Sequence, residues 1–433
     1  MGKLGHNRIV GKGLVPKSTD MVTGEIVVNE EDGIPYFKKG DNSVIPIGGG
    51  TQEDYTMTIG NINNPLLDLP LNNNLAMKQG SGSVTFTRAT TATYVDRYGV
   101  VQTAGVDEAR FEKDGLLVEG ASTNKLLYSG DFTNSAWVKE TATAVESAEL
   151  SPDGVSKAYD ISNSSSNNDV VKQAVSASPS LEHVYSFFVK GVAGTIIYIN
   201  LKRDYDSGNG GEFIETITPI TMNGEWQRAS GKITLLADNT GVDCRVYSDS
   251  ASNVFQIWGA QLEQLPFASS YIPTTGVAVT RTVDNCLLDI NGNINNIGDS
   301  MTIICDVDFD VNGNTPSEFL SYYNNDDNSI TFRYYAGKYE VSINGVNTQF
   351  ITPNQGESRV AMTYGGTITR LYIDGSIIVE RSAIVPTRGY ASGKKLMIGG
   401  LYTTGDNIQP LSGNIKNLRI YDKALTASEI RLA

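Results

Sequence analysis

The strongest constraint on the fold is a run of alternating apolar residues near residue 300. Apolar side chains occupy every second position: Ile303, Cys305, Val307, Phe309 and Val311. Successive side chains of a β-strand point to opposite faces of a sheet, so this spacing puts the whole set on one buried face. The pattern predicts a strand over residues 301–311.

Short strands separated by turn residues continue to the end of the chain. Asn344-Gly345 and Asp374-Gly375 mark tight turns whose twist matches that of hairpin strands. Thr426 and Glu429 have the spacing of a capping box, which predicts one short helix after Thr426. The further strands expected here cover residues 318–323, 329–335, 338–343, 358–364 and 396–398.

The centre of the chain carries a nearly continuous apolar run over residues 255–262. It predicts a strand buried on both faces, with Trp258 in the core rather than exposed as a platform for a sugar ring. Apolar residues alternate over 185–189 and again over 197–201, with a Gly-rich turn between them, which predicts a hairpin. Together with strands over 226–235 and 242–247, these segments indicate a jelly-roll β-sandwich in an all-β protein.

The charge balance excludes several classes of partner. The 433 residues include 34 Lys and Arg against 48 Asp and Glu, a net charge of −14. Nucleic-acid binding needs clustered cations, and anionic membranes attract basic surfaces, so neither partner is expected. No apolar run approaches the ~20 residues that span a bilayer, and residues 1–13 lack the apolar core of a secretory signal. The protein is therefore expected to be made in a cytoplasm and not inserted into a membrane.

The sequence offers little for catalysis. It contains two histidines, His6 and His183, so a Ser-His-Asp triad has little to draw on. No Gly-rich phosphate loop follows a strand into a helix, and sequence alone cannot pair two carboxylates for glycoside hydrolysis. Three cysteines without metal-site spacing predict no disulfide framework, and Cys305 is expected to be an inert buried thiol. We predict no enzyme activity.

Three stretches resemble segments of bacteriophage tail-fibre and other virion appendage proteins. They are "VPKSTDMVTGEIVVNEEDGIPYFKKG" near the N-terminus, the segment from Val84 to Lys139 that begins "VTFTRATTATYVDRYGVVQTAG", and "FQIWGAQLEQLPFASSYIPTTGVAVTRTVD". The resemblance implies a virion protein assembled in the host cytoplasm, a homotrimer, and attachment to other virion proteins through residues 1–50. Arg88, Asp96, Arg110 and Glu119 match charged positions of the second stretch, and we interpret them as salt-linked loops rather than catalytic groups.

The C-terminal part resembles the laminin-G or concanavalin-like lectin fold. The matching segments are "SRVAMTYGGTITRLYIDGSIIVERSA" and "GNIKNLRIYDKALTASEI". The predicted organisation is an N-terminal attachment segment with a β-hairpin (1–50), an extended connecting region with short strands (51–136), a jelly-roll module (137–284) and a lectin-like domain (285–433). The short strands expected in the connecting region cover residues 84–87, 93–95, 100–103 and 116–119. The joint at residues 271–281 is expected to bring Thr280-Arg281 close to Thr87-Arg88.

A polar loop between two predicted strands is the candidate ligand site. Aromatic faces stack on sugar rings, and Asp or Asn side chains bind hydroxyls or calcium. No cofactor is expected other than calcium at such a loop. A hydrophilic turn with core tyrosines is the competing interpretation. The candidate residues are Tyr323, Asn324, Asn325, Asp326, Asp327, Tyr334 and Tyr335.

Two other polar groups carry weaker site hypotheses. Asp306, Asp308 and Asp310 share one face of a strand, where calcium binding competes with a solvated outer face. The loop 203–211 is either a ligand loop or a hairpin tip. The functional expectation is a non-enzymatic virion fibre whose outer domains bind host surface glycans. The alternatives are a purely structural decoration or collar fibre and a glycan-degrading depolymerase.

Overall fold

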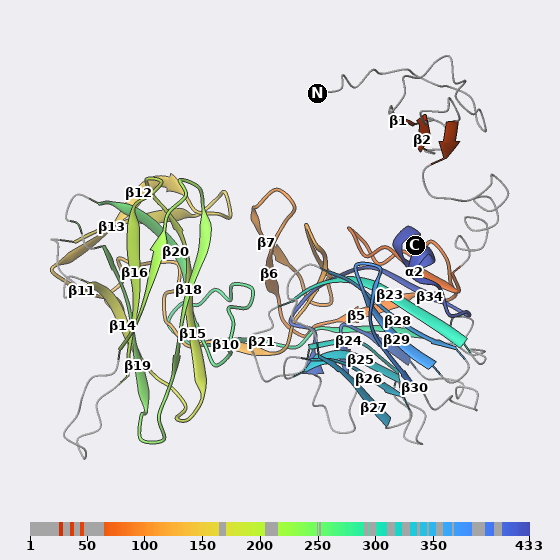
Figure 1. Cartoon of the computed structure of the whole chain (residues 1–433). Helices are drawn as coiled ribbons and strands as arrows, with labels where there is room; N and C mark the ends of the chain where they lie inside the picture. The colour runs from red at the N-terminus through yellow and green to blue at the C-terminus, as the bar shows by residue number, and fades with distance from the viewer. Residues whose placement is uncertain are drawn as a thin grey trace. The chain divides into compact units, whose positions relative to one another are not determined.

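Figure 1 shows the computed structural model of the chain, whose described residues are almost entirely β-structure with one short helix, α2 (Ala427–Leu432). The all-β prediction is therefore confirmed. The structure describes residues 26–28, 35–38, 44–46, 65–163, 170–203, 215–248, 250, 253–289, 293, 300–309, 317–322, 330–335, 338–343, 346–351, 358–365, 368–382, 395–401 and 409–433.

The chain divides into two compact units, and the smaller comprises residues 1–64 with 432–433. Its described strands are β1 (Ile26–Val28), β2 (Pro35–Lys38) and β3 (Val44–Pro46), paired antiparallel in the order β1-β2-β3. The expected pairing of the first two strands is present. The third strand could not be predicted from the sequence, because it has three residues and ends in Pro46, a residue that disfavours strands.

The larger unit, residues 65–431, contains a jelly-roll sandwich of two five-stranded antiparallel sheets. From β13 to β20, successive strands cross between the sheets except at the β16–β17 hairpin, which is jelly-roll connectivity. One sheet contains, in order, β11 (Val138–Glu140), β14 (Val170–Ser176), β19 (Gly241–Ser248), β16 (Ile196–Arg203) and β17 (Glu215–Thr221). The other contains β12 (Ala142–Leu150), β13 (Lys157–Asn163), β20 (Phe255–Glu263), β15 (Glu182–Lys190) and β18 (Gln227–Thr234).

The central strand β20 is buried on both faces, as its apolar run predicts. Trp258 is a core residue and packs against Phe188 and Tyr271, with ring centroids 5.8 Å and 4.8 Å away. The predicted hairpin between residues 185–189 and 197–201 is wrong. β15 pairs with β18 and β20, whereas β16 pairs with β17 and β19 in the opposite sheet. Two strands that face each other across a core alternate in the same way as hairpin partners, so periodicity could not separate the two cases.

A second sandwich follows the jelly roll and has the concanavalin-like fold. The predicted inward set on β23 is buried as far as the structure describes it, including Cys305. One sheet contains, in order, β27 (Val346–Ile351), β26 (Lys338–Ile343), β25 (Ile330–Tyr335), β24 (Ser317–Tyr322), β31 (Lys395–Ile398), β22 (Asn285–Asp289) and β5 (Val84–Thr87). The other contains β30 (Ser376–Ser382), β29 (Ile368–Ile373), β28 (Ser358–Gly365), β23 (Ser300–Phe309), β34 (Gly413–Tyr421), β9 (Gly115–Val118) and β8 (Arg110–Glu112), with β4 (Leu67–Leu69) also on β34.

The capping box produces the predicted helix, α2 (Ala427–Leu432). The Thr426 backbone N–H donates to Glu429 Oε2 at 2.7 Å, and the Glu429 N–H donates to Thr426 Oγ1 at 3.3 Å. A further short pair, β32 (Gly400–Leu401) with β33 (Gln409–Pro410), lies near β24.

Four strands of this second sandwich come from residues 65–118, far upstream in the chain. β4 and β9 pair with β34, β8 pairs with β9, and β5 pairs with β22. Leu67 and Leu69 are fully buried in the same core as Ile415 and Leu418. The predicted strands over residues 84–87 and 116–119 are present as β5 and β9. The region predicted to connect the domains thus supplies strands and core side chains to the second sandwich.

Two short strand pairs stand outside the sheets of both sandwiches. β6 (Ala92–Val95) and β7 (Val101–Ala104) form a hairpin, and β10 (Ser122–Asn124) pairs with β21 (Val279–Arg281). The β10–β21 pair joins the point where the chain leaves the second sandwich to the point where it returns. The expected proximity of Thr280-Arg281 to Thr87-Arg88 is confirmed, because both arginines belong to one ion-pair network.

The contribution of the upstream strands can be measured with Leu69→Ala. Removing this fully buried side chain is expected to lower the free energy of unfolding by about 2–5 kcal/mol. Val155→Ala is the matched control, because Val155 is 82% exposed and its truncation should change stability by less than about 0.5 kcal/mol. Urea unfolding of the full chain followed by far-UV circular dichroism provides the measurement. Equal midpoints for the two variants would show that β4 is not part of the core.

Candidate functional site

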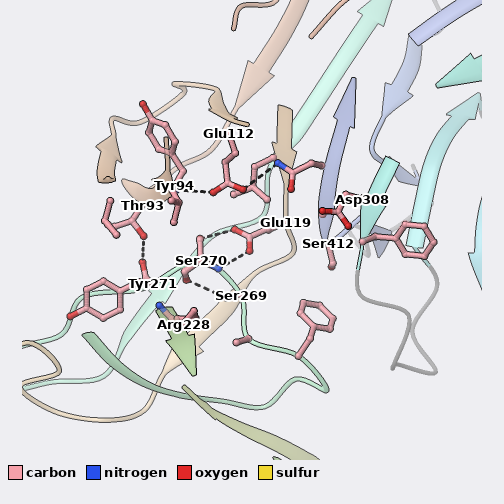
Figure 2. A pocket seen from close by; sticks show the side chains of 18 of the residues that line it. Thr93, Tyr94, Glu112, Glu119, Arg228, Ser269, Ser270, Tyr271, Asp308 and Ser412 are labelled. Carbon is pink, nitrogen blue, oxygen red and sulfur yellow. Dashed lines mark hydrogen bonds between the residues drawn. The ribbon is translucent and has the colours of Figure 1, made fainter. Parts of the chain in front are cut away.

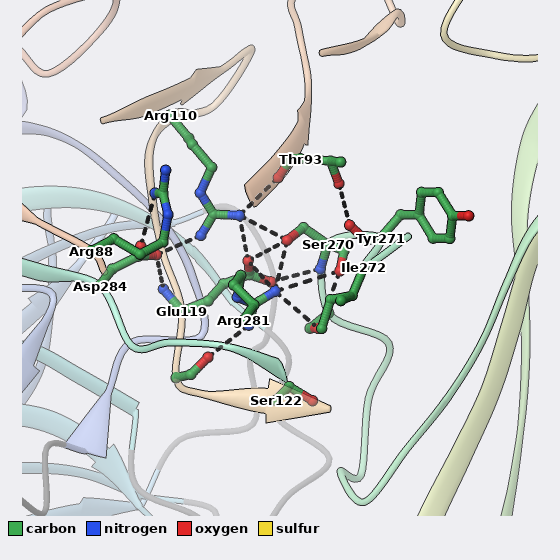
Figure 3. Close-up of polar contacts among 12 residues, drawn as sticks. Arg88, Thr93, Arg110, Glu119, Ser122, Ser270, Tyr271, Ile272, Arg281 and Asp284 are labelled. Carbon is green, nitrogen blue, oxygen red and sulfur yellow. Dashed lines mark hydrogen bonds and ion pairs between the residues drawn. The ribbon is translucent and has the colours of Figure 1, made fainter. Parts of the chain in front are cut away.

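A buried network of alternating positive and negative side chains lies at the ends of strands β5, β8, β9, β21 and β22 (Figure 3). Arg88 binds Asp284 at 3.1 Å, and Arg110 binds both Asp284 and Glu119, the latter at 2.8 Å. Arg281 completes the series on Glu119 at 3.0 Å. We call these five residues the ionic joint.

Strand boundaries place every member of the ionic joint. Arg88 follows β5, Arg110 opens β8, Glu119 follows β9, Arg281 closes β21, and Asp284 precedes β22. All five side chains are almost completely excluded from water. A buried charge is tolerated only when partners replace its hydration, and the alternating order of cations and anions supplies them.

Electrostatics confirm that Glu119 is held as a carboxylate. Burial alone would raise the pKa of Glu119, but Arg281 and Arg110 lower it from 4.5 to about 2. Ser270 adds two hydrogen bonds to the same carboxylate, from its N–H at 2.8 Å and its hydroxyl at 2.7 Å. The predicted salt-linked role thus holds for Arg88, Arg110 and Glu119.

Asp96 does not belong to this group. Its carboxylate accepts hydrogen bonds from the backbone N–H groups of Tyr98 and Val100 at 2.9 Å and 3.0 Å, and from the Gln102 amide. These bonds lower the pKa of Asp96, although burial opposes them. Asp96 therefore stabilises the turn of the β6–β7 hairpin.

Serines connect the ionic joint to the first sandwich. Arg281 donates to Ser269 Oγ at 3.2 Å, and Ser269 donates to the buried carboxylate of Glu263 at the end of β20. Ser122 of β10 donates to the same carboxylate at 2.6 Å. These contacts fix residues 269–271, which form one wall of a cavity.

The cavity has a volume of about 290 Å³ and lies beside the ionic joint (Figure 2). It is lined by the β6–β7 hairpin, by residues 267–271, and by parts of both sandwiches. Much of its surface is apolar. The lining residues are Thr93, Tyr94, Val95, Val101, Glu112, Leu117, Glu119, Phe188, Arg228, Phe267, Ala268, Ser269, Ser270, Tyr271, Asp308, Phe309, Ser412, Gly413 and Asn414.

Arg228 of β18 is a cation that lines this cavity, and no carboxylate among the described residues forms an ion pair with it. Its Nη2 donates to Ser186 Oγ at 2.9 Å, while its buried Nε has no hydrogen-bond partner. The guanidinium lies 4.6 Å from the ring centroid of Phe188 and 6.0 Å from that of Tyr271. Burial lowers the pKa of Arg228 to about 10, partly opposed by Glu263, so the side chain stays cationic at neutral pH.

Acidic groups line other parts of the same cavity. Glu112 accepts hydrogen bonds from the Val95 N–H at 2.7 Å and the Asn414 amide at 3.2 Å, and burial raises its pKa. Asp308 of β23 lies on the side of the second sandwich. Figure 2 shows Arg228 well apart from both carboxylates. An apolar wall with a cation and acceptors at separate places can bind and orient a small polar molecule.

The loop predicted as a ligand site lies mostly outside the described residues. Tyr323, Asn324, Asn325, Asp326 and Asp327 fall there, so their role stays a prediction. Tyr334 is buried in the core, with ring centroids of Phe309 and Tyr339 5.2 Å away, and its faces are not open to a sugar. Tyr335 is exposed on the outer face beneath Arg333, whose guanidinium lies 5.6 Å from the ring centroid.

The aspartates of β23 have separate surroundings. Asp306 is paired with Arg359 at 2.7 Å and accepts a hydrogen bond from Asn417 at 2.7 Å. Asp308 lines the cavity, and Asp310 lies outside the described residues, as does most of the loop 203–211. The described part of the chain contains no group of three His, Cys, Asp or Glu side chains that could hold a metal ion.

The sequence alone does not predict the cavity. Arg228 sits in a predicted strand, and Ser269 to Tyr271 sit in the stretch that resembles phage proteins, but their contact depends on tertiary structure. A charged residue within a strand otherwise expected to face a core was the one available signal. His183 does not line the cavity, and burial lowers its pKa. All three cysteines are buried free thiols.

Comparison with known families agrees with the fold of the second sandwich. A laminin-G family model described as the Concanavalin A-like lectin/glucanases superfamily matches residues 293–431. This match covers less than half of the chain and identifies the fold of that part. No curated protein matches the chain. No helix among the described residues is long and apolar enough to cross a bilayer.

Several solved structures share partial likeness. The CBM40 module of the Ruminococcus gnavus IT-sialidase, bound to α2,3-sialyllactose, is 18% identical with a TM-score of 0.28, covering 31% of this chain and 81% of that one. A pentraxin from Limulus polyphemus is 15% identical with a TM-score of 0.26, covering 31% and 68%. The xylan-binding CBM22-1 domain of Paenibacillus barcinonensis Xyn10C is 14% identical with a TM-score of 0.27, covering 34% and 94%. TM-scores this low carry no argument about this chain.

The ionic joint predicts a specific acid sensitivity. The pKa of Glu119 is 4.5 when unpaired and about 2 in the folded chain, so its stabilisation is complete above pH 4.5 and lost as pH falls toward 2. That loss amounts to about 3 kcal/mol. Glu119→Gln is expected to cost about 3–5 kcal/mol at pH 7, because it leaves Arg110 and Arg281 short of a partner, and to remove this part of the pH dependence.

Glu380→Gln is the control for this experiment. Glu380 forms an ion pair with Arg370 at 2.7 Å, but its side chain is half exposed, so its loss should cost less than about 1 kcal/mol. Urea unfolding at several pH values between 2 and 7 would measure both variants. If Glu119→Gln and Glu380→Gln behaved alike, the ionic joint would not be a determinant of stability.

Proposed function

We propose that this chain is a non-enzymatic component of a bacteriophage virion, a tail fibre or other appendage, that binds glycans on the host surface. The observation that carries the glycan-binding part is the concanavalin-like sandwich over residues 293–431 with an open cavity of mixed polar and apolar lining against it. Such a lining suits a sugar, which presents both C–H faces and hydroxyl groups. Because one fold hosts many functions, the site and the motifs must support the proposal beside the fold.

The virion role draws on sequence resemblance. The stretches from Val15 to Gly40, from Val84 to Lys139 and from Phe255 to Asp284 are similar to segments of phage appendage proteins. The strands β1 to β3 form a sheet too small to bury a core alone, which suits a segment that docks on another virion protein. The chain acts in the assembled virion, after synthesis in the host cytoplasm.

A binding role also fits the chemistry of the described residues. Of the two strongly perturbed carboxylates that the structure describes, Glu119 is held between two arginines. Glu318, whose pKa burial raises to about 8, pairs with Arg333 and does not line the cavity, so both serve the structure. Arg228 and Glu112 face the cavity without a nucleophile and base pair beside them. These groups hold a ligand in place rather than transform it.

Glycan binding is testable with the full-length protein and a panel of bacterial envelope polysaccharides. Saturable binding to at least one polysaccharide is expected, competed by the free polysaccharide and without any shortening of its chains. The measurement is biolayer interferometry, with size-exclusion chromatography of the polysaccharide after incubation. Absence of binding to every polysaccharide and to host cells would favour a purely structural collar or decoration fibre. Shortened chains would instead reveal a depolymerase.

Oligomeric state offers an independent test of the fibre role. We expect a homotrimer, since three intertwined chains leave no strand edge of an attachment segment unpaired. Light scattering coupled to size-exclusion chromatography should give three times the 46.7 kDa chain mass. A monomer at micromolar concentration would contradict the fibre proposal while leaving glycan binding open.

A further inference from the structure

We propose that the cavity beside Arg228 binds a single acidic sugar residue, with the sugar carboxylate on Arg228 and its hydroxyl groups toward Glu112 and Asp308. This inference rests on the proposed glycan-binding function and names the class of glycan: one that contains uronic acid or a comparable monocarboxylate sugar.

Arg228 has no ion-pair partner among the described residues. Its guanidinium is positioned by Ser186 and by the face of Phe188, yet no carboxylate forms an ion pair with it in the described part of the chain. Glu263 and Glu119 act on this cation without forming an ion pair with it, so an anion that enters the cavity gains from direct contact with the guanidinium. The planar guanidinium has parallel N–H groups that match the two oxygens of a carboxylate.

The part of the cavity lining away from Arg228 carries carboxylates. Glu112 and Asp308 face the cavity away from Arg228, so a second negative charge on the ligand would meet carboxylates there (Figure 2). Hydroxyl groups, by contrast, donate to carboxylate oxygens. A molecule with one carboxylate and a neutral polyol body satisfies both ends of the cavity.

The cavity has the size and the apolar surface to hold one sugar ring. A volume of about 290 Å³ corresponds to roughly ten water molecules, at the small end of ligand pockets. That space suits one sugar ring rather than an oligosaccharide. Val101, Leu117, Phe188 and Phe309 line it with apolar surface that can contact the C–H groups of the ring.

Calorimetric titration of the full-length chain would test the inference with defined probes. Methyl glucuronide and methyl galacturonide are compared with methyl glucoside and methyl galactoside, which differ by the carboxylate alone. At least one uronide is expected to bind at least about tenfold more tightly than its neutral counterpart, the effect of one charge-assisted pair. Arg228→Gln is expected to abolish this preference, and Arg228→Lys, which keeps the charge without the planar fork, to retain part of it.

Arg370→Gln is the control variant. It removes an arginine of β29 that pairs with Glu380 of the neighbouring strand β30, and neither residue lines the cavity, so it should leave the preference intact. Thermal unfolding of each variant checks that Arg228→Gln is folded, and Arg228→Lys provides a second measure if it is not. Equal binding of uronide and glycoside, or a preference that persists in Arg228→Gln, would overturn the inference. Tighter binding of a free α-amino acid than of any uronide would also overturn it and assign the acidic groups to an ammonium.

The outcome separates this inference from the proposed function. Polysaccharide binding that is neutral-sugar specific and unchanged in Arg228→Gln would reject the acidic-sugar site and keep the glycan-binding role. No binding to any polysaccharide would reject the role itself.

Discussion

The ionic joint is the interaction on which the arrangement of the larger unit depends. Its five side chains stand at the ends of five different strands, and each cation is satisfied only when the neighbouring anion is in place. Because all five are buried, a displaced segment would leave a charge without solvent or partner. The joint thus favours one placement of β5, β8, β9, β21 and β22. Through Ser269 and Ser270 it also positions the wall of the cavity that lies opposite the second sandwich.

The connectivity makes the jelly roll an insertion in the concanavalin-like sandwich. The chain builds β4, β5, β8 and β9, leaves for the jelly roll, and returns at β22 to complete the same two sheets. β10 and β21 form the neck through which it leaves and returns. Thr87-Arg88 and Thr280-Arg281 lie close together for this reason, because both arginines stand beside the same neck. The placement of the cavity at this neck explains why its lining draws on both sandwiches.

Much of the secondary structure could be predicted because it depends on local patterns. The alternation on β23, the apolar run of β20 and the capping box at Thr426 each follow from backbone geometry. Partner choice could not be predicted in the same way. The β15 and β16 segments look like a hairpin, although β16 pairs with β19 further along the chain. The strand over residues 84–87 could be predicted, but its pairing with β22, about 200 residues later, could not.

The candidate site shows the same limit. Arg88, Arg110 and Glu119 could be assigned to salt links because they match charged positions of the second phage-like stretch. Asp284 ends the third phage-like stretch, and no local pattern there indicates its arginine partners. Tyr334 and Tyr335 are adjacent in sequence, and the pleat sends one into the core and the other to solvent. Arg228 acquires its place in a cavity only when the β6–β7 hairpin and the second sandwich lie next to it.

The insertion also has a consequence for the order in which the protein is made. β4 emerges from the ribosome roughly 350 residues before its partner β34, a delay of tens of seconds at about 5–20 residues per second. During that time β4, β5, β8 and β9 have an incomplete sheet and an exposed apolar face, while the whole jelly roll can fold on its own strands. The first strands of the larger unit are therefore among the last to reach their native partners. The nascent chain must stay free of aggregation until its C-terminal strand arrives.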